Sequence, residues 1–158
     1  MHIKLFFIGK TAFSYINDGI IIFEKRLSHY APFEIITIES SKKSGTSKNE
    51  LVQKQYEADL ILKKIKPNDY LVLLDEKGKE YNSVQFSGAL QKLMLSLQSN
   101  LIFIVGGAYG FDEKVYKRAN MLLSLSKMTF SHQMIRLFFL EQLYRAMTII
   151  RNEPYHHG

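Results

Sequence analysis

Three segments of this 158-residue chain carry residue types that bind cofactors or move protons. The first, residues 105–110, reads Val-Gly-Gly-Ala-Tyr-Gly and follows an apolar run. Glycines allow tight turns and close approach of the backbone to a ligand, so a nucleotide-binding turn is one interpretation. However, Ala108 stands where the G-x-G-x-x-G pattern needs its second glycine, and no suitably placed ribose-binding acid follows. A nicotinamide site is therefore disfavoured, and an ordinary strand-to-helix turn explains the segment better.

The second segment, residues 124–133, alternates polar and apolar residues without glycine or proline. In its simplest interpretation it is a connector, in which Ser131 caps the next helix and His132 hydrogen-bonds to nearby backbone. The alternative is a loop that is held by its own packing.

The third segment, residues 152–158, places Tyr155 and His156 after Pro154. His2 and His29 are far away in sequence and there is no cysteine, so no metal site is predicted. A G-x-S-x-G elbow and a P-loop lysine motif are also missing, which disfavours acyl transfer and nucleotide hydrolysis.

The charge of the chain indicates a polyanionic partner. A net charge of +6 and a pI near 9.4 favour binding to nucleic acid, although solvated surface charge is an equal alternative. Lys42, Lys43 and Lys48 are expected to contact phosphates or solvent. The longest nearly apolar stretch, residues 101–111, is shorter than the roughly 20 residues that span a bilayer. With no secretory signal at the N-terminus, we expect no membrane association and a cytoplasmic location.

Strand and helix patterns alternate along the chain and predict one α/β domain over residues 1–158. Ile16, Ile20, Phe23 and Leu27 share a helical face, and Ser47 with Glu50 fits a capping box. Continuously apolar strands indicate a mostly parallel sheet flanked by helices. Strands are expected at 3–8, 33–39, 69–75, 101–105 and 121–125, and helices from 15 to before Pro32, then at 47–65, 83–97, 112–119 and 133–151.

Two further expectations follow from these elements. Ligands of open α/β sheets bind beyond the C-terminal ends of strands, which directs attention to loops after Leu74, Val105 and Leu125. The last helix is apolar around most of its circumference, apart from a polar stripe of Glu141, Arg145 and Thr148. A chain this small can rarely surround such a helix, so we expect a homodimer.

Four blocks of sequence, in this order, resemble the RlmH family of SPOUT-class methyltransferases, which act on large-subunit ribosomal RNA. The resemblance covers the chain end to end, and the blocks are residues 104–110, 123–132, 141–146 and 154–156. It implies a SPOUT fold with a C-terminal trefoil knot, which no periodicity argument predicts. Each block alone is weak evidence, whereas their order is specific.

The resemblance also implies a site for S-adenosyl-L-methionine, held by backbone and apolar contacts. Matched by motif, the cofactor-binding residues are Leu74, Gly106, Gly107, Leu125, Ser126, Lys127, Met128, Thr129 and Phe130. The family commonly has proline at the position of Ser131, so this loop departs from the pattern.

The implied reaction is methyl transfer to N3 of a pseudouridine in large-subunit (23S) rRNA, within an assembled ribosome. His132, Arg145, Tyr155 and His156 are the predicted catalytic residues, because N3 must lose a proton and a base or cationic group assists. An ion pair with Glu141 is the simpler role for Arg145, and aromatic packing for Tyr155. A non-enzymatic basic RNA-binding module and a small nucleotide-binding oxidoreductase remain the alternative functions.

Overall fold

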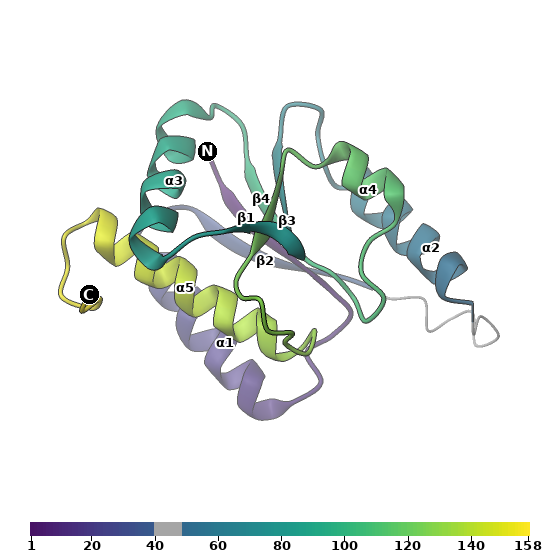
Figure 1. The fold of residues 1–158 in the computed structure, drawn as a ribbon, viewed down its shortest axis with the longest axis horizontal. Coiled ribbons are helices and arrows are strands. Elements are labelled where there is room, and N and C mark those ends of the chain that lie inside the picture. The colour runs from purple at the N-terminus through teal and green to yellow at the C-terminus, as the bar shows by residue number, and fades with distance from the viewer. Residues whose placement is uncertain (40–48) are drawn as a thin grey trace.

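The computed structural model describes residues 1–39 and 49–158, which form a five-stranded sheet in the order β2-β1-β4-β3-β5 (Figure 1). All four strand pairings are parallel, which confirms the predicted α/β class. The strands are β1 (Ile3–Ile8), β2 (Phe33–Ile38), β3 (Tyr70–Glu80), β4 (Leu101–Val105) and β5 (Met121–Ser124). The helices are α1 (Ser14–Leu27), α2 (Glu50–Lys63), α3 (Ser83–Ser96), α4 (Glu113–Arg118) and α5 (Met134–Ile150).

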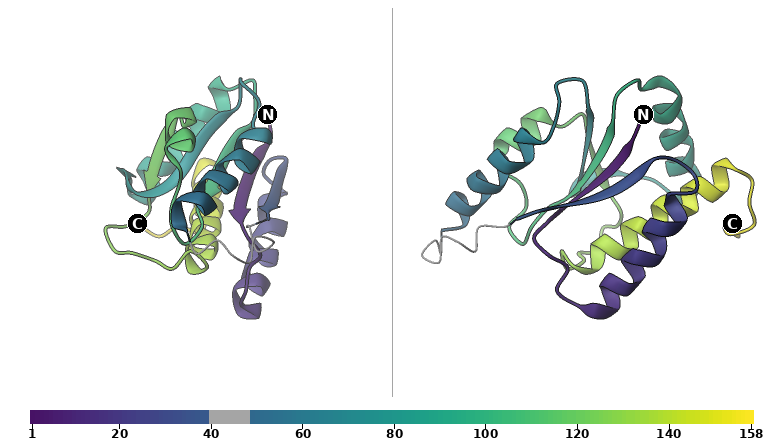
Figure 2. Two further views of the ribbon diagram at one scale, coloured as in Figure 1. Left: turned by 90° about the vertical axis from the view of Figure 1, so that its right-hand side faces the viewer. Right: turned by 180° about the vertical axis from the view of Figure 1, so that it is seen from behind.

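Helices cover both faces of the sheet, as the side view and the view from behind show (Figure 2). α1, α3 and α5 lie on one face, where Leu5 and Phe103 belong to the hydrophobic core beneath them. α2 and α4 lie on the other face, over a core that includes Phe6 and Ile104. Successive strand residues point to opposite faces, so the central strand β4 is buried along its whole length.

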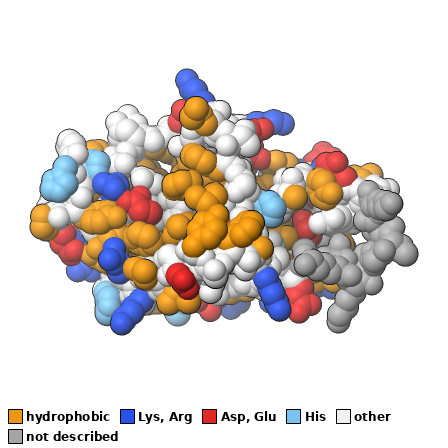
Figure 3. All heavy atoms as spheres, turned by 90° about the horizontal axis from the view of Figure 1, so that it is seen from below, with side chains coloured by type: hydrophobic (Ala, Val, Ile, Leu, Met, Phe, Trp, Pro, Cys, Tyr) orange, Lys and Arg blue, Asp and Glu red, His pale blue; other side chains and the backbone are white. Residues whose placement is uncertain are grey.

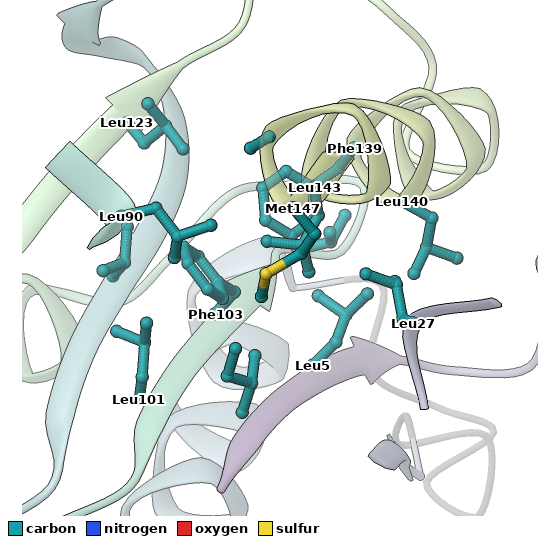
Figure 4. Packing of buried hydrophobic residues seen from close by; sticks show 14 of the residues in the cluster. Leu5, Leu27, Leu90, Leu101, Phe103, Leu123, Phe139, Leu140, Leu143 and Met147 are labelled. Carbon is teal, nitrogen blue, oxygen red and sulfur yellow. The ribbon is translucent and has the colours of Figure 1, made fainter. Parts of the chain in front are cut away.

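Helix α5 is buried because it packs between α1 and α3. Phe139, Leu143 and Met147 point from it into the core (Figure 4). The predicted polar stripe is wrong at Thr148, which is fully buried. Its hydroxyl donates to the carbonyl oxygen of Arg145 over 2.7 Å, so the helix backbone supplies the partner that burial requires.

Strand β3 is longer than predicted, and no loop follows Leu74. The strand continues to Glu80 with a bulge over residues 75–78, because Leu74 and Lys79 both pair with Leu123 of β5. The end of β3 crosses β5 closely at Gly78 (Figure 1). A Cβ on Gly78 would lie 2.5 Å from the backbone nitrogen of Leu123, so only glycine fits at this crossing.

The caps of two helices test the predicted starts. Asp112 caps α4 as predicted, since its side chain accepts from the Lys114 amide over 2.9 Å. Helix α2 begins later than predicted, and Asn49 rather than Ser47 is its N-cap. Lys42, Lys43 and Lys48 lie outside the described residues.

Candidate functional site

A cavity of about 390 Å³ opens beside the bulge of β3 and at the C-terminal ends of β4 and β5. Three segments line most of it, namely residues 74–77, 105–111 and 123–130 with the exception of Lys127, and Tyr116 and Ile135 complete the wall. The structure therefore brings together eight of the nine residues predicted to bind cofactor. These are Leu74, Gly106, Gly107, Leu125, Ser126, Met128, Thr129 and Phe130. Lys127 is exposed and does not line the cavity.

The loop between β5 and α5 is held by its own hydrogen bonds. The Ser124 hydroxyl donates to the carbonyl oxygen of Ser126 over 3.0 Å, and the Ser126 hydroxyl accepts from the Met128 amide over 2.9 Å. The Ser131 hydroxyl accepts from the Met134 amide over 3.1 Å, as a capping side chain would, but the N-cap of α5 is Gln133 rather than the predicted Ser131. Short polar side chains thus fix the loop without proline.

The glycine turn after β4 needs glycine for space and for conformation. Gly110 has a φ of +77°, in the region that favours glycine. A Cβ on Gly106 would lie 3.1 Å from the Phe111 ring, and one on Gly107 would lie 3.3 Å from Oε2 of Glu57. The side chains of Phe111 and Glu57 therefore pack closely against the turn, and the backbone of the turn lines the cavity.

Glu57 is a buried acid that sequence reasoning missed. It projects from α2 toward the turn, and burial raises the pKa of its carboxyl group above the ordinary value of 4.5. Oε1 accepts from Nε2 of Gln53 over 3.2 Å. No sequence pattern marks this residue, because a glutamate on a polar helix is usually exposed.

Asp75 and Tyr116 form a second pair that sequence reasoning missed. Both line the cavity, and the Tyr116 hydroxyl donates to Oδ2 of Asp75. Oδ1 of Asp75 accepts from the Lys77 amide over 2.8 Å. Burial, with the Asp75 contact second, raises the pKa of Tyr116, so this phenol stays neutral. The position of Asp75 at the end of an apolar strand was the signal available in the sequence.

Arg136 lies wholly inside the protein, near the start of α5. Its guanidinium donates to the carbonyl oxygens of Ile8, Gly9 and His132 and to the Thr11 hydroxyl. Burial lowers its pKa to about 10, so it remains charged at neutral pH. Its place in an otherwise apolar segment could have singled it out.

Three of the four predicted catalytic residues meet at the other end of α5. Nη2 of Arg145 lies 2.7 Å from Oε1 of Glu141, and Nη1 lies 3.1 Å from Nδ1 of His156. The Tyr155 hydroxyl donates to the same Glu141 oxygen over 3.0 Å. The expected ion pair is present, and so is aromatic packing of Tyr155, whose ring centroid lies 4.7 Å from that of Tyr144.

The contact between Arg145 and His156 fixes the tautomer of the histidine. A guanidinium can only donate, so Nδ1 of His156 must accept and a neutral ring carries its proton on Nε2. Tyr155 is also a donor here, because burial and the bond to Glu141 raise its pKa. The cluster therefore presents donors and a positive charge rather than a free base.

His132 lies apart from this cluster. It precedes α5, whereas Arg145 lies in the second half of that helix. At about 1.5 Å per residue, cavity residue Ile135 and Arg145 are about 15 Å apart along the axis. Burial and, secondarily, the charge of Arg136 lower the pKa of His132 below the ordinary 6.5. Within one chain, therefore, Arg145, Tyr155 and His156 lie outside the cavity wall.

The described part of the chain holds neither a membrane-spanning helix nor a cluster of metal ligands. Across residues 1–39 and 49–158, no helix is long and apolar enough to cross a bilayer. Within the same residues, no three histidine, cysteine or acidic side chains are grouped to hold a metal ion.

Comparison with known proteins places the chain in a family. A family model described as "Predicted SPOUT methyltransferase" matches residues 1–156. Proteins named ribosomal RNA large subunit methyltransferase H are similar over their full lengths. The one from Parabacteroides distasonis is 56% identical over 99% of both chains, and the one from Cytophaga hutchinsonii is 52% identical over 99% of this chain and 100% of its own. The crossing of β3 over β5, the cavity at the strand ends and these matches lead to one conclusion: the chain belongs to the SPOUT methyltransferase family, whose fold contains a C-terminal trefoil knot.

Proposed function

We propose that this methyltransferase uses S-adenosyl-L-methionine to methylate N3 of a pseudouridine in large-subunit ribosomal RNA. Residues 1–158 act as a single domain in the cytoplasm, on the assembled ribosome. The observation that carries the proposal is the cavity of about 390 Å³, a volume within the usual range for small-molecule sites, formed by the segments predicted to bind cofactor. The names of the relatives support ribosomal RNA as substrate.

The cavity wall suits an adenosine and its methionine chain. Leu74, Leu125 and Phe130 offer apolar contacts, while Gly106 and Gly107 expose backbone groups for hydrogen bonds. Lys127 would act from outside the wall. When bound, the cofactor supplies a methyl group made electrophilic by the sulfonium, and the protein aligns the reactants and excludes water.

The distance between cavity and tail supports a dimeric enzyme. Reacting atoms must approach to about 3 Å, but in one chain Arg145 lies about 15 Å along the axis of α5 from Ile135, which lines the cavity. A second copy can bring its own tail to this cavity. Exposed hydrophobic side chains support such an interface; they are Phe13, Tyr15, Met128, Phe130 and Phe138. Figure 3 shows hydrophobic side chains gathered across the middle of one face.

In the proposed reaction the tail cluster stabilises negative charge on the target base. Arg145 supplies the positive charge, and Nε2 of His156 donates to a carbonyl oxygen of the base, which stabilises the anion that forms when N3 loses its proton. The Tyr155 hydroxyl, which donates to Glu141 in the free protein, would exchange this bond for one to the base. His132 is the proposed proton acceptor. Its lowered pKa keeps the imidazole neutral near pH 7, and no side-chain hydrogen bond occupies its ring in the described structure.

A methylation assay on ribosomes tests this assignment. Tyr155→Phe and His156→Ala, changed singly, are expected to lower turnover about 10-fold or more, as loss of a charge-stabilising donor does. His157→Ala, one residue further along the exposed tail, is the matched control and should retain wild-type turnover. Wild-type rates in both test variants would remove the tail from the mechanism.

Two more measurements address the rest of the proposal. Calorimetry with S-adenosylmethionine separates an enzyme from a basic RNA-binding module, which would not bind the cofactor. Mass spectrometry of rRNA from cells lacking the protein identifies the modified base. Because phosphate contacts release counterions, ribosome binding should weaken as salt rises, and an unchanged affinity would contradict a role for the basic surface.

A further inference from the structure

We propose that Asp75 makes the cavity discriminate by charge, so that it favours the cationic methyl donor over the neutral thioether left after transfer. This inference rests on the proposed function, because it assigns a specificity role within the same cavity. It concerns affinity and product release rather than the chemical step.

Asp75 is a fixed charge in the cavity wall. Its two carboxylate oxygens accept from different elements, Oδ1 from the Lys77 amide within the bulge of β3 and Oδ2 from the Tyr116 hydroxyl on α4. Asp75 is half-buried, and Tyr116 lines the cavity beside it. Two donors from separate elements orient the carboxylate before any ligand arrives, so binding requires little reorganisation.

The charge of the wall is opposite to that of the protein as a whole. Charged side chains in the wall are Asp75, Glu76 and Lys77, so two carboxylates face one ammonium. The chain carries a formal net charge of +6. Glu76 is bonded to the loop after β5, since its Oε2 lies 3.5 Å from the Thr129 hydroxyl, and its side chain is exposed. Asp75 is therefore the better shielded of the two acids, and its field is less screened by water.

Methyl transfer changes the ligand charge by one unit. N3 attacks the methyl carbon, the bond from carbon to sulfur breaks, and its electron pair stays on sulfur. The sulfonium thereby becomes a neutral thioether. A carboxylate held in the wall attracts the ligand before this step more than after it, which weakens retention of the product. A preference of about five- to tenfold for the cationic ligand is expected at the partly screened separations of such a cavity.

Titration calorimetry with three ligands tests the inference. S-adenosylmethionine carries the sulfonium, sinefungin carries an amine at that place, and S-adenosylhomocysteine carries a neutral sulfur. In the wild-type protein both cationic ligands should bind about five- to tenfold more tightly than S-adenosylhomocysteine. Added salt should reduce this difference in affinity, because it screens the charge of Asp75. Equal affinities for sinefungin and S-adenosylhomocysteine would overturn the inference without any variant.

The variant Asp75→Asn removes the charge and keeps groups that can bond to Lys77 and Tyr116. The substitution should lower the affinity for both cationic ligands about five- to tenfold, and the affinity for S-adenosylhomocysteine should stay within about twofold of the wild-type value. The control Glu113→Gln removes the same charge from an exposed position outside the cavity and should change none of the affinities. Equal weakening of all three ligands would show that Asp75 serves a shared contact, against the inference. Failure of all three to bind the wild-type protein would instead contradict the proposed function.

Discussion

Arg136 joins the start of α5 to the end of β1, because its Nη2 donates to the carbonyl oxygen of Ile8 over 2.7 Å across 128 positions of sequence. Nη1 donates to Gly9 and Thr11, and the guanidinium lies 4.7 Å from the centre of the Phe7 ring. Backbone dipoles rather than a carboxylate stabilise this buried charge. The same helix turn contributes Ile135 to the cavity wall, so Arg136 fixes part of the site.

Arg136→Met should destabilise the protein by about 3 kcal/mol, because it leaves the buried carbonyl oxygen of Ile8 and the partly buried ones of Gly9 and His132 without their donor. Denaturant unfolding measures the change. Arg145→Met is the control: the Arg145–Glu141 pair is partly exposed and should contribute about 1 kcal/mol or less, while methyl transfer is lost. If the two variants had the same free energy of unfolding, the Arg136 contacts would contribute no more to stability than the Arg145–Glu141 pair.

Gly78→Ala should cost about 3 kcal/mol, near the upper end for overpacking, since the new methyl group meets the backbone of Leu122 and Leu123 rather than a movable side chain. The melting temperature of the Gly78→Ala variant measures this loss of stability. Gly88→Ala in α3 is a matched control, because nothing lies within 4 Å of its added Cβ. That variant should gain about 0.5–1 kcal/mol from helix propensity. A Gly78→Ala protein that melts like the wild type would disprove the close crossing.

Glu57→Gln should stabilise the protein at pH 7. Burial raises the folded-state pKa of Glu57 above 4.5, so its favourable contribution is complete below pH 4.5 and is lost as the pH rises through the folded value. Glutamine is neutral at every pH and avoids this loss. We expect a gain of about 2–4 °C in Tm at pH 7, the change that ~1 kcal/mol produces at this size, and none near pH 4. A gain that does not vary with pH would point to packing instead.

His132→Gln should slow methyl transfer and change its pH dependence. If a neutral His132 accepts the N3 proton, the wild-type rate falls as the pH drops through the pKa of this imidazole, which lies below 6.5. The variant should lose about 100-fold in turnover, the lower end for a general base, and this acidic limb should vanish. If the variant were slower but its rate still fell at acidic pH, the group that titrates would be another residue.

Local patterns in the sequence predicted most of the fold. The continuous apolar run of residues 101–105 became β4 at those bounds, and Asp112 caps α4. The longer β3 was missed because Glu76, Lys77 and Gly78 are unlike strand residues, and the strand resumes pairing with β5 only beyond them, at Lys79 and Glu80. The sequence of α5 alone put Thr148 on a polar face, because that sequence does not show that α1 and α3 pack against this helix.

The candidate site was predictable as far as it consists of backbone turns. Gly106, Gly107 and Leu125 follow strand ends, so a rule about parallel sheets brings them together. Asp75 was not predicted, because its partner Tyr116 is 41 positions away and only the fold joins them. Resemblance grouped His132 with Arg145, whereas they lie toward opposite ends of one helix.

The close passage of residue 78 over Leu123 also constrains how a newly made chain matures. The cavity wall draws on residues from Leu74 through Ile135, and both strands of the crossing, β3 and β5, contribute to it. A polypeptide still emerging, with residues 123–135 unmade, therefore lacks one of the three segments that line the cavity, together with Ile135.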